Sequence, residues 1–536
     1  MLLKPLGDSA WLVEFSGENP LASVTSLVKS LEKYRPAGVL DVVPSFASVA
    51  VHFSGDTARG IHQWLSDALR KDSEIPRSTA SKLVEIPVCY GGENGPDLAD
   101  VAQQLGLSED EVIALHSGAD YTVATVGFSP GFPYLSGLPK RLHLPRKATP
   151  RLSVPAGSVA IASAQAGIYP FSSPGGWHLL GRTQVKLFDP NSPRPALLQA
   201  GDTLRFIPVA PTAATALTHA SHAVSVPQAN SRCFEVIHPG SLSTVQDLGR
   251  PGYESSGVSP GGAVDRAALR MANLLVGNEE NAAALEMCVT GPILKFHAPA
   301  TIALTQFQAR PRSVNAGEII DLSRLCGGVR AYLAIAGGIH VPQVLGSAST
   351  DLRAGFGGYG GRALQAGDRL EIGTPGRIPA GRNWHIATRG AKPEIELRFL
   401  SGMQSEWFSE AALRQFQATT YQLTPNGDRM GARLVGAALE LTTPREMQSQ
   451  AVACGSVQVP PDGQPIILLA ERQTIGGYPQ IGHVISVDLP RLACAWPGTR
   501  IRFREVTWDE ARALRQREEQ EFASLRTGLE LLKPIA

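Results

Sequence analysis

The chain has 536 residues, and a typical domain size of about 150 residues predicts three or four compact units. The formal net charge is +1, so no overall field would recruit nucleic acid or an anionic membrane. The six cysteines form no CxxC pair and have no zinc-ligand spacing with histidine, and we interpret them as reduced structural thiols. Without a signal-peptide pattern or a run of about 18 apolar residues, we expect a cytoplasmic protein with no membrane span.

The first 80 residues predict a small α+β domain. Residues 10–15 and 48–53 have the composition of short strands, and apolar residues recur at helical spacing between them. A second helix is predicted at 57–71. This order of elements is typical of a split βαβ unit over residues 1–80.

Residues 81–208 predict a β domain with two helices near its start. Asp97 is expected to cap the first helix, and Ser108 with Glu111 forms a capping box for the second. From residue 121 onward, short β-branched or apolar runs alternate with Pro and Gly turns. This texture favours a barrel-like all-β fold.

The segment 209–232 is small, polar and without periodicity, and is the predicted linker. Its two histidines, His219 and His222, have no other ligands clustered nearby, so we assign them no metal. The β-rich pattern then resumes and contains one predicted helix near 263–276. The composition changes at residues 373–393, which suggests a second domain boundary there. We expect β domains over 233–385 and 386–506 and a C-terminal helix over 507–536.

Several glycine-rich runs carry charged residues, which favours anion recognition by exposed amides. The alternative is that a β-barrel simply needs Gly and Pro in its turns. In three of these runs, glycines that allow unusual backbone angles lie close to charged side chains. These three runs contain Asp247 and Arg250, Arg353 and Arg362, and Asp428 and Arg429.

The absence of several known motifs also excludes some classes of enzyme. There is no GxxxxGK[ST] phosphate loop, no Met-Lys-Met segment that would carry biotin, no Ser-Ser-Lys amidase run and no HExxH. We therefore expect no metal site. An enzyme built on this chain would need an unfamiliar nucleotide site or a partner protein.

Long, irregular motifs make the chain resemble a known pair of families. Residues 1–208 resemble the B component of the multi-subunit enzyme 5-oxoprolinase, also labelled KipI or allophanate hydrolase subunit 1. The matching stretches include GDSAWLVEF (7–15), GFSPGFPYLSGLP (127–139) and GIYPFSSPGGWHLLGRT (167–183). Residues 234–505 resemble the C component of that enzyme, also labelled KipA or allophanate hydrolase subunit 2. Here the stretches include STVQDLGRPGYESSGV (243–258), RAGFGGYGGR (353–362) and VPPDGQPIILLAERQTIGGYP (459–479). The pair is also similar to the carboxyltransferase domain of urea carboxylase.

The resemblance implies a mainly β fold, in which a small α+β N-terminal domain is followed by three cyclophilin-like β-barrels. It implies ATP-dependent opening of 5-oxoproline to glutamate, with ATP and Mg as cofactors and a separate third subunit as partner. Motif position suggests Asp265, Glu286, Arg250 and Arg429 as catalytic residues. The suggested substrate-binding residues are Asp247, Arg353, Asp428, Gln473, Tyr478, Tyr134, Arg151, Gln165, Tyr169, Ser173 and His116.

Two other functions stay open. One is biotin-dependent carboxyl transfer to urea or another amide, with biotin on a separate carrier. The other is regulation of a histidine kinase, as KipI-like and KipA-like proteins do, although a fused chain makes such antagonism harder. A solvated C-terminal helix and a helix that mediates homo-oligomerisation are both compatible with the sequence.

Overall fold

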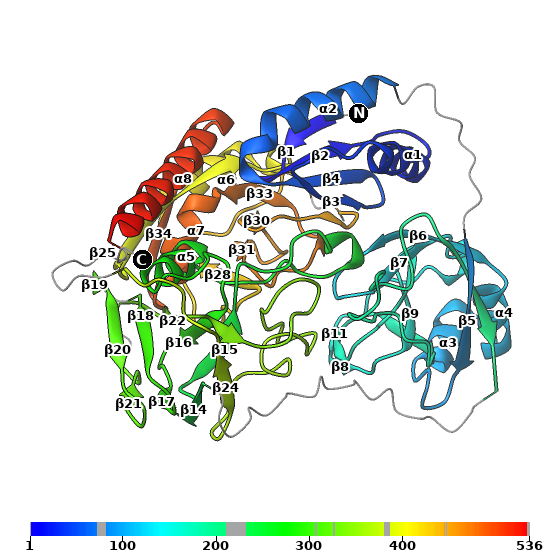
Figure 1. The fold of residues 1–536 in the computed structure, drawn as a ribbon. Coiled ribbons are helices and arrows are strands. Elements are labelled where there is room, and N and C mark those ends of the chain that lie inside the picture. The colour runs from blue at the N-terminus through cyan, green and yellow to red at the C-terminus, as the bar shows by residue number, and fades with distance from the viewer. Residues whose placement is uncertain are drawn as a thin grey trace.

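The computed structural model describes residues 2–71, 82–210, 232–305, 308–324, 327–379, 386–387, 389–443, 445 and 447–532. Most of the predicted linker, with His219 and His222, lies outside these residues. The described chain is mainly β, with a small α+β unit at its N-terminus (Figure 1). None of its helices is long and apolar enough to cross a membrane.

The N-terminal unit is a four-stranded antiparallel sheet in the order β1-β2-β4-β3. Its strands are β1 (Leu2–Pro5), β2 (Ala10–Glu14), β3 (Val39–Pro44) and β4 (Ser48–Phe53). Helices α1 (Pro20–Lys33) and α2 (Ala58–Lys71) bury apolar side chains against it. Because β4 lies between β2 and β3, the unit β2-α1-β3 is a split βαβ motif, as predicted.

The first closed barrel has the strand order β10-β7-β6-β13-β5-β12-β9. Its first strand, β5 (Leu83–Tyr90), pairs in parallel with its last, β13 (Thr203–Pro208), and this pairing joins the two ends of the sheet. The helices α3 (Leu98–Leu105) and α4 (Glu109–Ser117) pack against its core. The other strands are β6 (Asp120–Val126), β7 (Pro133–Ser136), β9 (Ser158–Ala162), β10 (Gln165–Ile168) and β12 (His178–Arg182).

Two helix-capping predictions for this barrel have different outcomes. Ser108 and Glu111 form the expected capping box at α4, with both reciprocal hydrogen bonds present. Asp97 stands at the N-cap position of α3 as predicted, but its side chain makes no capping hydrogen bond. Its carboxylate instead accepts hydrogen bonds from Lys147 and Arg151, because these cations lie beside it across the fold.

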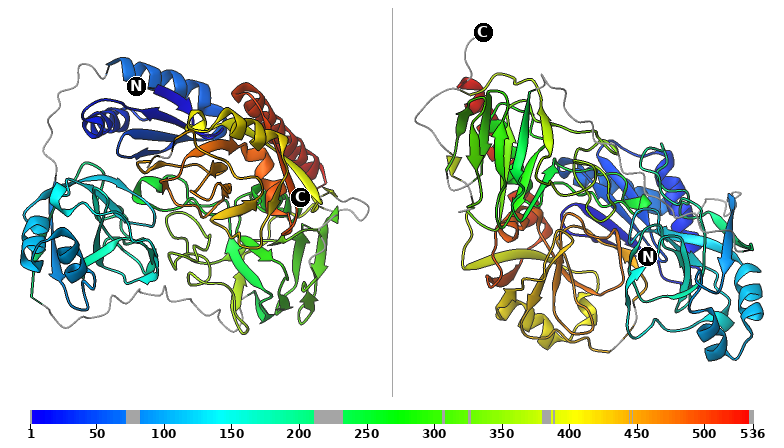
Figure 2. Two further views of the ribbon diagram at one scale, coloured as in Figure 1. Left: turned by 180° about the vertical axis from the view of Figure 1, so that it is seen from behind. Right: turned by 90° about the horizontal axis from the view of Figure 1, so that it is seen from below.

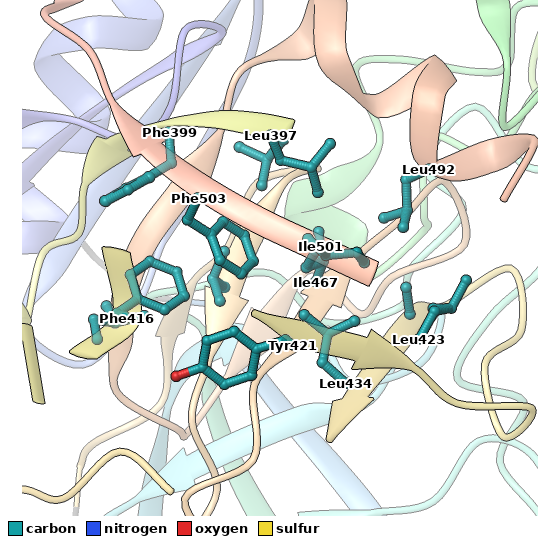
Figure 3. Packing of buried hydrophobic residues seen from close by; sticks show 14 of the residues in the cluster. Leu397, Phe399, Phe416, Tyr421, Leu423, Leu434, Ile467, Leu492, Ile501 and Phe503 are labelled. Atoms are coloured by element: carbon teal, nitrogen blue, oxygen red, sulfur yellow. The ribbon is translucent and has the colours of Figure 1, made fainter. Parts of the chain in front are cut away.

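A second closed barrel has the order β26-β33-β30-β31-β28-β27-β34 and again joins its ends by a parallel pair. Its core is aromatic, and the rings of Phe416 and Phe503 stack 4.2 Å apart (Figure 3). Phe416 comes from α6 (Glu410–Ala418). The strands are β26 (Glu394–Ser401), β27 (Tyr421–Leu423), β28 (Gly431–Val435), β30 (Ser456–Gln458), β31 (Ile466–Leu468), β33 (Gln480–Val484) and β34 (Arg500–Glu505).

The third expected barrel, at the start of the second half, is not closed. The described residues there form two five-stranded sheets, β21-β17-β14-β24-β23 and β15-β16-β22-β18-β20, around one apolar core. Its first strand, β14 (Cys233–His238), pairs only in antiparallel fashion with β17 and β24. The parallel first-to-last pairing that closes the other two barrels is therefore missing among the described strands of this unit.

The strands of these two sheets are β15 (Leu242–Gln246), β16 (Ala284–Cys288), β17 (Ile293–Phe296), β18 (Ala300–Leu304), β20 (Pro311–Val314), β21 (Ile319–Asp321), β22 (Arg330–Ile335), β23 (Ile339–His340) and β24 (Arg369–Ile372). Helix α5 (Arg266–Leu275) packs on β22, with Asp265 as its N-cap. The C-terminal helix α8 (Trp508–Leu531) begins at Thr507, which accepts from the amide of Glu510. Short pairs complete the fold: β8 (Arg151–Val154) with β11 (Ser173–Gly175), β19 (Gln308–Ala309) with β25 (Ile386–Ala387), and β29 (Gln450–Ala451) with β32 (Ile475–Gly476).

The two halves of the chain interlock. The N-terminal unit lies over the second barrel, and the first barrel lies beside the second half (Figures 1 and 2). Asp8 accepts hydrogen bonds from the amide and hydroxyl of Ser486. The ring centroids of Trp11 and of Trp508 in α8 lie 5.3 Å apart. One apolar cluster takes residues from the N-terminal unit, the first barrel and the second barrel.

A glycine lets the halves approach closely. A Cβ atom on Gly127 would lie only 2.2 Å from Cγ1 of Ile475 across the interface. We predict that Gly127→Val costs about 1–3 kcal/mol of stability, because the buried contact has no room for added volume. Denaturant unfolding would measure this cost. Gly60→Val is the control, since no atom lies within 4 Å of a Cβ at Gly60, and an equal loss in both variants would contradict the prediction.

Candidate active site

A cleft opens where the two halves of the chain meet. The first half contributes residues 128–130 and 171–173, and the second half contributes the other side. The cleft is narrow in this structure, with a cavity volume of about 20 Å³, and it opens to solvent. Most of its lining residues are polar or charged, but apolar atoms form most of its exposed wall, so it suits a small ligand that has both apolar surface and hydrogen-bonding groups. The polar lining residues include Ser129, Ser173, Asp351, Arg353, Glu471 and Gln473.

Arg353 is the only lysine or arginine among the lining residues. Its guanidinium lies 4.8 Å above the ring of Phe128 and donates to the sulfur of Met430 at 3.7 Å. Burial lowers the pKa of Arg353, and the charges of Asp351 and Asp428 oppose this effect, so the group stays cationic. Within the described residues it forms no ion pair, which leaves it available to a ligand anion.

Phe128 has a positive φ of 66°, a conformation that side chains rarely adopt. Its neighbours Gly127 and Ser129 make the tight loop that faces the second half, and the amide of Gly131 donates to the carbonyl of Ser256. Strained backbone of this kind persists where the surrounding structure fixes it, and it concentrates at ligand sites. Here the strain places an aromatic ring against the guanidinium of Arg353.

Glu471 reaches the cleft from a buried ionic network. Arg429 donates from Nε to Glu471 at 2.6 Å, from Nη1 to Glu286, and from Nη2 to the carbonyl of Gly262 at 2.6 Å. Glu286 also accepts from the Tyr332 hydroxyl at 2.6 Å. Burial raises the pKa of Glu471 although Arg429 opposes the rise. The cleft therefore holds a carboxyl group whose environment favours proton transfer.

Two predicted tyrosines stand beside the cleft in an aromatic cluster with Phe132 and Trp177. Burial raises the pKa of Tyr134 to about 12, and the nearby charges of Arg146 and Arg353 oppose the rise. Burial also raises the pKa of Tyr169. Both hydroxyls are therefore neutral hydrogen-bonding groups at physiological pH. Ser173 lines the cleft itself, and its buried hydroxyl has no hydrogen-bond partner within the described part of the chain.

Asp247 and Arg250, predicted for binding and catalysis, instead hold a turn together. The Asp247 carboxylate accepts from the hydroxyls of Ser347 and Ser349, at 2.6 Å each, and from two backbone amides. Arg250 is buried, donates to the carbonyl of Ser349, and lies 4.9 Å above the ring of Phe356. Neither residue lines this cleft, and their roles in substrate binding and catalysis stay predictions.

His116 was expected near the cleft but lies inside the core of the first barrel. It stacks on Phe206 at 4.5 Å and its Nδ1 lies 2.7 Å from the Tyr90 hydroxyl. Burial lowers the pKa of His116 to about 3, so it is a neutral core residue.

Four other predicted binding residues are also absent from the cleft lining. Arg151 is paired with Asp97, and the exposed Asp428 accepts from the amides of Met430 and Gly431. Gln165 begins β10, and Tyr478 is exposed. These residues were predicted because they lie in or near glycine-rich motifs, and such motifs also form ordinary turns.

Of the predicted catalytic residues, Glu286 and Arg429 bind each other and do not line the cleft. Asp265 caps α5 and lines a separate cavity beside α8. Sequence reasoning missed Phe128, Asp351 and Glu471, which do line the cleft. The stretch 459–479 contained Glu471, but its charge and burial depend on Arg429, which comes from a distant turn. Among the described residues, no group of three or more His, Cys, Asp or Glu side chains could hold a metal.

Comparisons with known proteins agree with this two-part architecture. The family "Carboxyltransferase domain, subdomain C and D" matches residues 1–198, and "Carboxyltransferase domain, subdomain A and B" matches residues 256–505. The chain belongs to the carboxyltransferase-domain family. It is a fusion of the C/D and A/B parts, which confirms the resemblance inferred from its motifs.

Relatives in this family match each half separately. The C component of the 5-oxoprolinase of Escherichia coli is 40% identical over 307 residues, which cover 54% of this chain and 97% of that protein. The B component of the 5-oxoprolinase of Bacillus subtilis is 40% identical over 225 residues, covering 38% of this chain and 91% of that protein. A urea amidolyase of Lachancea kluyveri is 30% identical over 331 residues, but these are only 18% of its length. The crystal structure of TTHA0988 covers 92% of this chain and 99% of its own, with a TM-score of 0.81 and 34% identity.

Asp265 should make stability depend on pH. Burial raises its pKa to about 6, so the folded state holds a proton that the unfolded state releases at a lower pH. Asp265 therefore destabilises the fold as the pH rises through about 6. We predict that Asp265→Asn, which keeps a helix cap, increases the free energy of unfolding by about 1–3 kcal/mol at neutral pH and changes it little near pH 4. Thermal unfolding across pH would show this, whereas equal effects at both pH values would contradict it.

Proposed function

We propose that the chain is the joined B and C component of an ATP-dependent 5-oxoprolinase. It binds 5-oxoproline in the cleft between its halves and, with a separate third subunit, opens the lactam to glutamate. The observation that carries this proposal is that one cleft takes its lining from both halves. Each half is similar to a different subunit of the same enzyme over nearly that subunit's whole length.

The cleft offers a partner to each polar part of the substrate. The unpaired guanidinium of Arg353 suits the carboxylate of 5-oxoproline. The unpartnered hydroxyl of Ser173 can donate to the lactam carbonyl, where negative charge develops during reaction. Glu471, whose pKa burial raises, can exchange a proton with the attacking water or the lactam nitrogen. Arg429 and Glu286 then act as positioning residues for Glu471.

The cleft does not fit magnesium-bound ATP as well as it fits the lactam. A triphosphate needs several cations around it, yet the lining has one guanidinium beside the carboxylates of Asp351 and Glu471. The described residues contain no candidate cluster of magnesium ligands. We therefore assign substrate binding, and no nucleotide step, to this cleft, and expect ATP to be held elsewhere in the complex with the third subunit.

A second candidate function is biotin-dependent carboxyl transfer to an amide. The family description and the similarity to a urea amidolyase favour it. The same cleft residues would bind an amide substrate, and Glu471 would remove a proton from its nitrogen. This function needs a biotin carrier and a biotin carboxylase as separate proteins.

Reconstitution separates the two functions. We expect the purified chain to release glutamate from 5-oxoproline and ATP only when the third oxoprolinase subunit of the same organism is added. Glutamate is measured by an enzyme-coupled assay, with the chain alone and the third subunit alone as controls. If the folded mixture stays inactive while a biotin carrier and carboxylase support carboxylation of an amide, the chain is a carboxyltransferase component.

Arg353 should set the affinity for the substrate carboxylate. In the reconstituted system, Arg353→Ala should lower kcat/KM by about tenfold to a hundredfold, because a charge-assisted hydrogen bond is lost. The matched control is Arg362→Ala in the same glycine-rich run. Arg362 pairs with Asp368 and does not line the cleft, so its variant should keep near-normal kcat/KM. Equal losses in the two variants, both with unchanged folding, would argue against the proposed role of Arg353.

A further inference from the structure

A second cavity lies between α5, α8 and β25, apart from the cleft. Its cavity volume is about 350 Å³, and it is partly open to solvent. Met271 of α5 and Phe522 and Leu525 of α8 give it an apolar wall. Asp265, Arg330 and Tyr332 lie on its polar side. No residue lines both cavities among those that the structure describes.

Asp265 has weak partners for a buried carboxylate. One carboxylate oxygen accepts from the amide of Ala268 at 2.8 Å. The other contacts only the thiol of Cys494 at 3.8 Å, and burial keeps that thiol protonated by raising its pKa to about 12. The residue is only 2% exposed and lies on the inner wall of the cavity. A buried carboxylate without a cation is costly, and such groups are retained mainly at functional sites.

The cations of the cavity are engaged elsewhere. Arg389 donates to Glu518 at 3.1 Å. Arg330 donates to the carbonyl of Ala493 at 3.2 Å, and its Nε lies 3.9 Å from Glu286. The lining has three carboxylates and two guanidiniums. Glu518 pairs with Arg389, and Glu521 pairs with Arg517 outside the lining. This leaves Asp265 as the carboxylate of the lining without an ion pair among the described residues. An incoming cation would be attracted, and an anion would be repelled.

We propose that this cavity is a second ligand site, for a small organic cation that carries an apolar group. Its ammonium or amidinium group binds Oδ2 of Asp265 in place of the long thiol contact from Cys494, and its apolar part packs between Met271, Phe522 and Leu525. The site stands independently of the oxoprolinase proposal, because its residues and its ligand class differ from those of the cleft. It also gives a reason for the otherwise unfavourable burial of Asp265.

Calorimetric titration of the full chain with two matched probes tests the charge preference. Tryptamine presents an indole ring and an ammonium, whereas indole-3-acetate presents the same ring and a carboxylate. At neutral pH we expect one tryptamine to bind per chain, and indole-3-acetate to bind at least about tenfold more weakly. Equal affinities, or no tryptamine binding at millimolar concentration, would overturn the proposal.

Variants then locate the site. Asp265→Asn keeps the helix cap and should weaken tryptamine binding about tenfold or more without weakening indole-3-acetate binding. Ala268→Phe fills the cavity and should abolish binding of both probes. Arg353→Ala in the cleft should leave tryptamine binding unchanged. Thermal unfolding verifies that each variant folds. Normal tryptamine binding by folded Asp265→Asn, or its loss in Arg353→Ala, would refute the assignment.

Discussion

The buried guanidinium of Arg429 is the interaction on which the second half of the chain depends. Arg429 precedes β28 of the second barrel, whereas its partner Glu286 lies on β16 of the neighbouring two-sheet unit. Two carboxylates and a carbonyl surround it, and burial raises the cost of losing any one of them. The two units therefore have one favourable relative position, the one in which every charge of this network is paired.

This network also explains why the carboxyl groups at the two cavities differ in their charge partners and in their pKa. Its Glu471 end lines the cleft between the halves, and its Tyr332 end lines the cavity beside α5. Tyr332 donates to Glu286 and accepts from the amide of Asp265 at 2.8 Å. Glu286 pairs with Arg429, whereas Asp265 forms no ion pair with a described residue and only feels the charge of Arg389. Neighbouring carboxylates of one network thus differ in pKa, which is lowered for Glu286 despite its burial and raised for Asp265.

Sequence patterns predicted local structure well because local structure depends on nearby residues. The capping box of Ser108 and Glu111, the helix after Asp265 and the split βαβ unit follow from spacing within a few residues. The cleft depends on contacts between distant segments. Ser173, Arg353 and Gln473 were predicted as binding residues because the motifs contain them, and they line the cleft. No local pattern indicated that Arg429 would form ion pairs with Glu286 and Glu471. The positive φ of Phe128 and the open third β unit likewise arise from tertiary packing.

Covalent fusion suits an assembly whose parts interlock in this way. The N-terminal unit contacts the second half through buried polar groups, since Asp41 accepts from the amide of Ser255 and His52 lies 3.7 Å from Glu254. Glu254 is in turn paired with Arg472, the neighbour of Glu471 in the cleft. Displacing the N-terminal unit would leave the amide of Ser255 without its partner Asp41 and would expose the Glu254–Arg472 pair, which adjoins Glu471 in the sequence. A linker that keeps the halves at high effective concentration therefore protects the geometry of the cleft as well as its assembly.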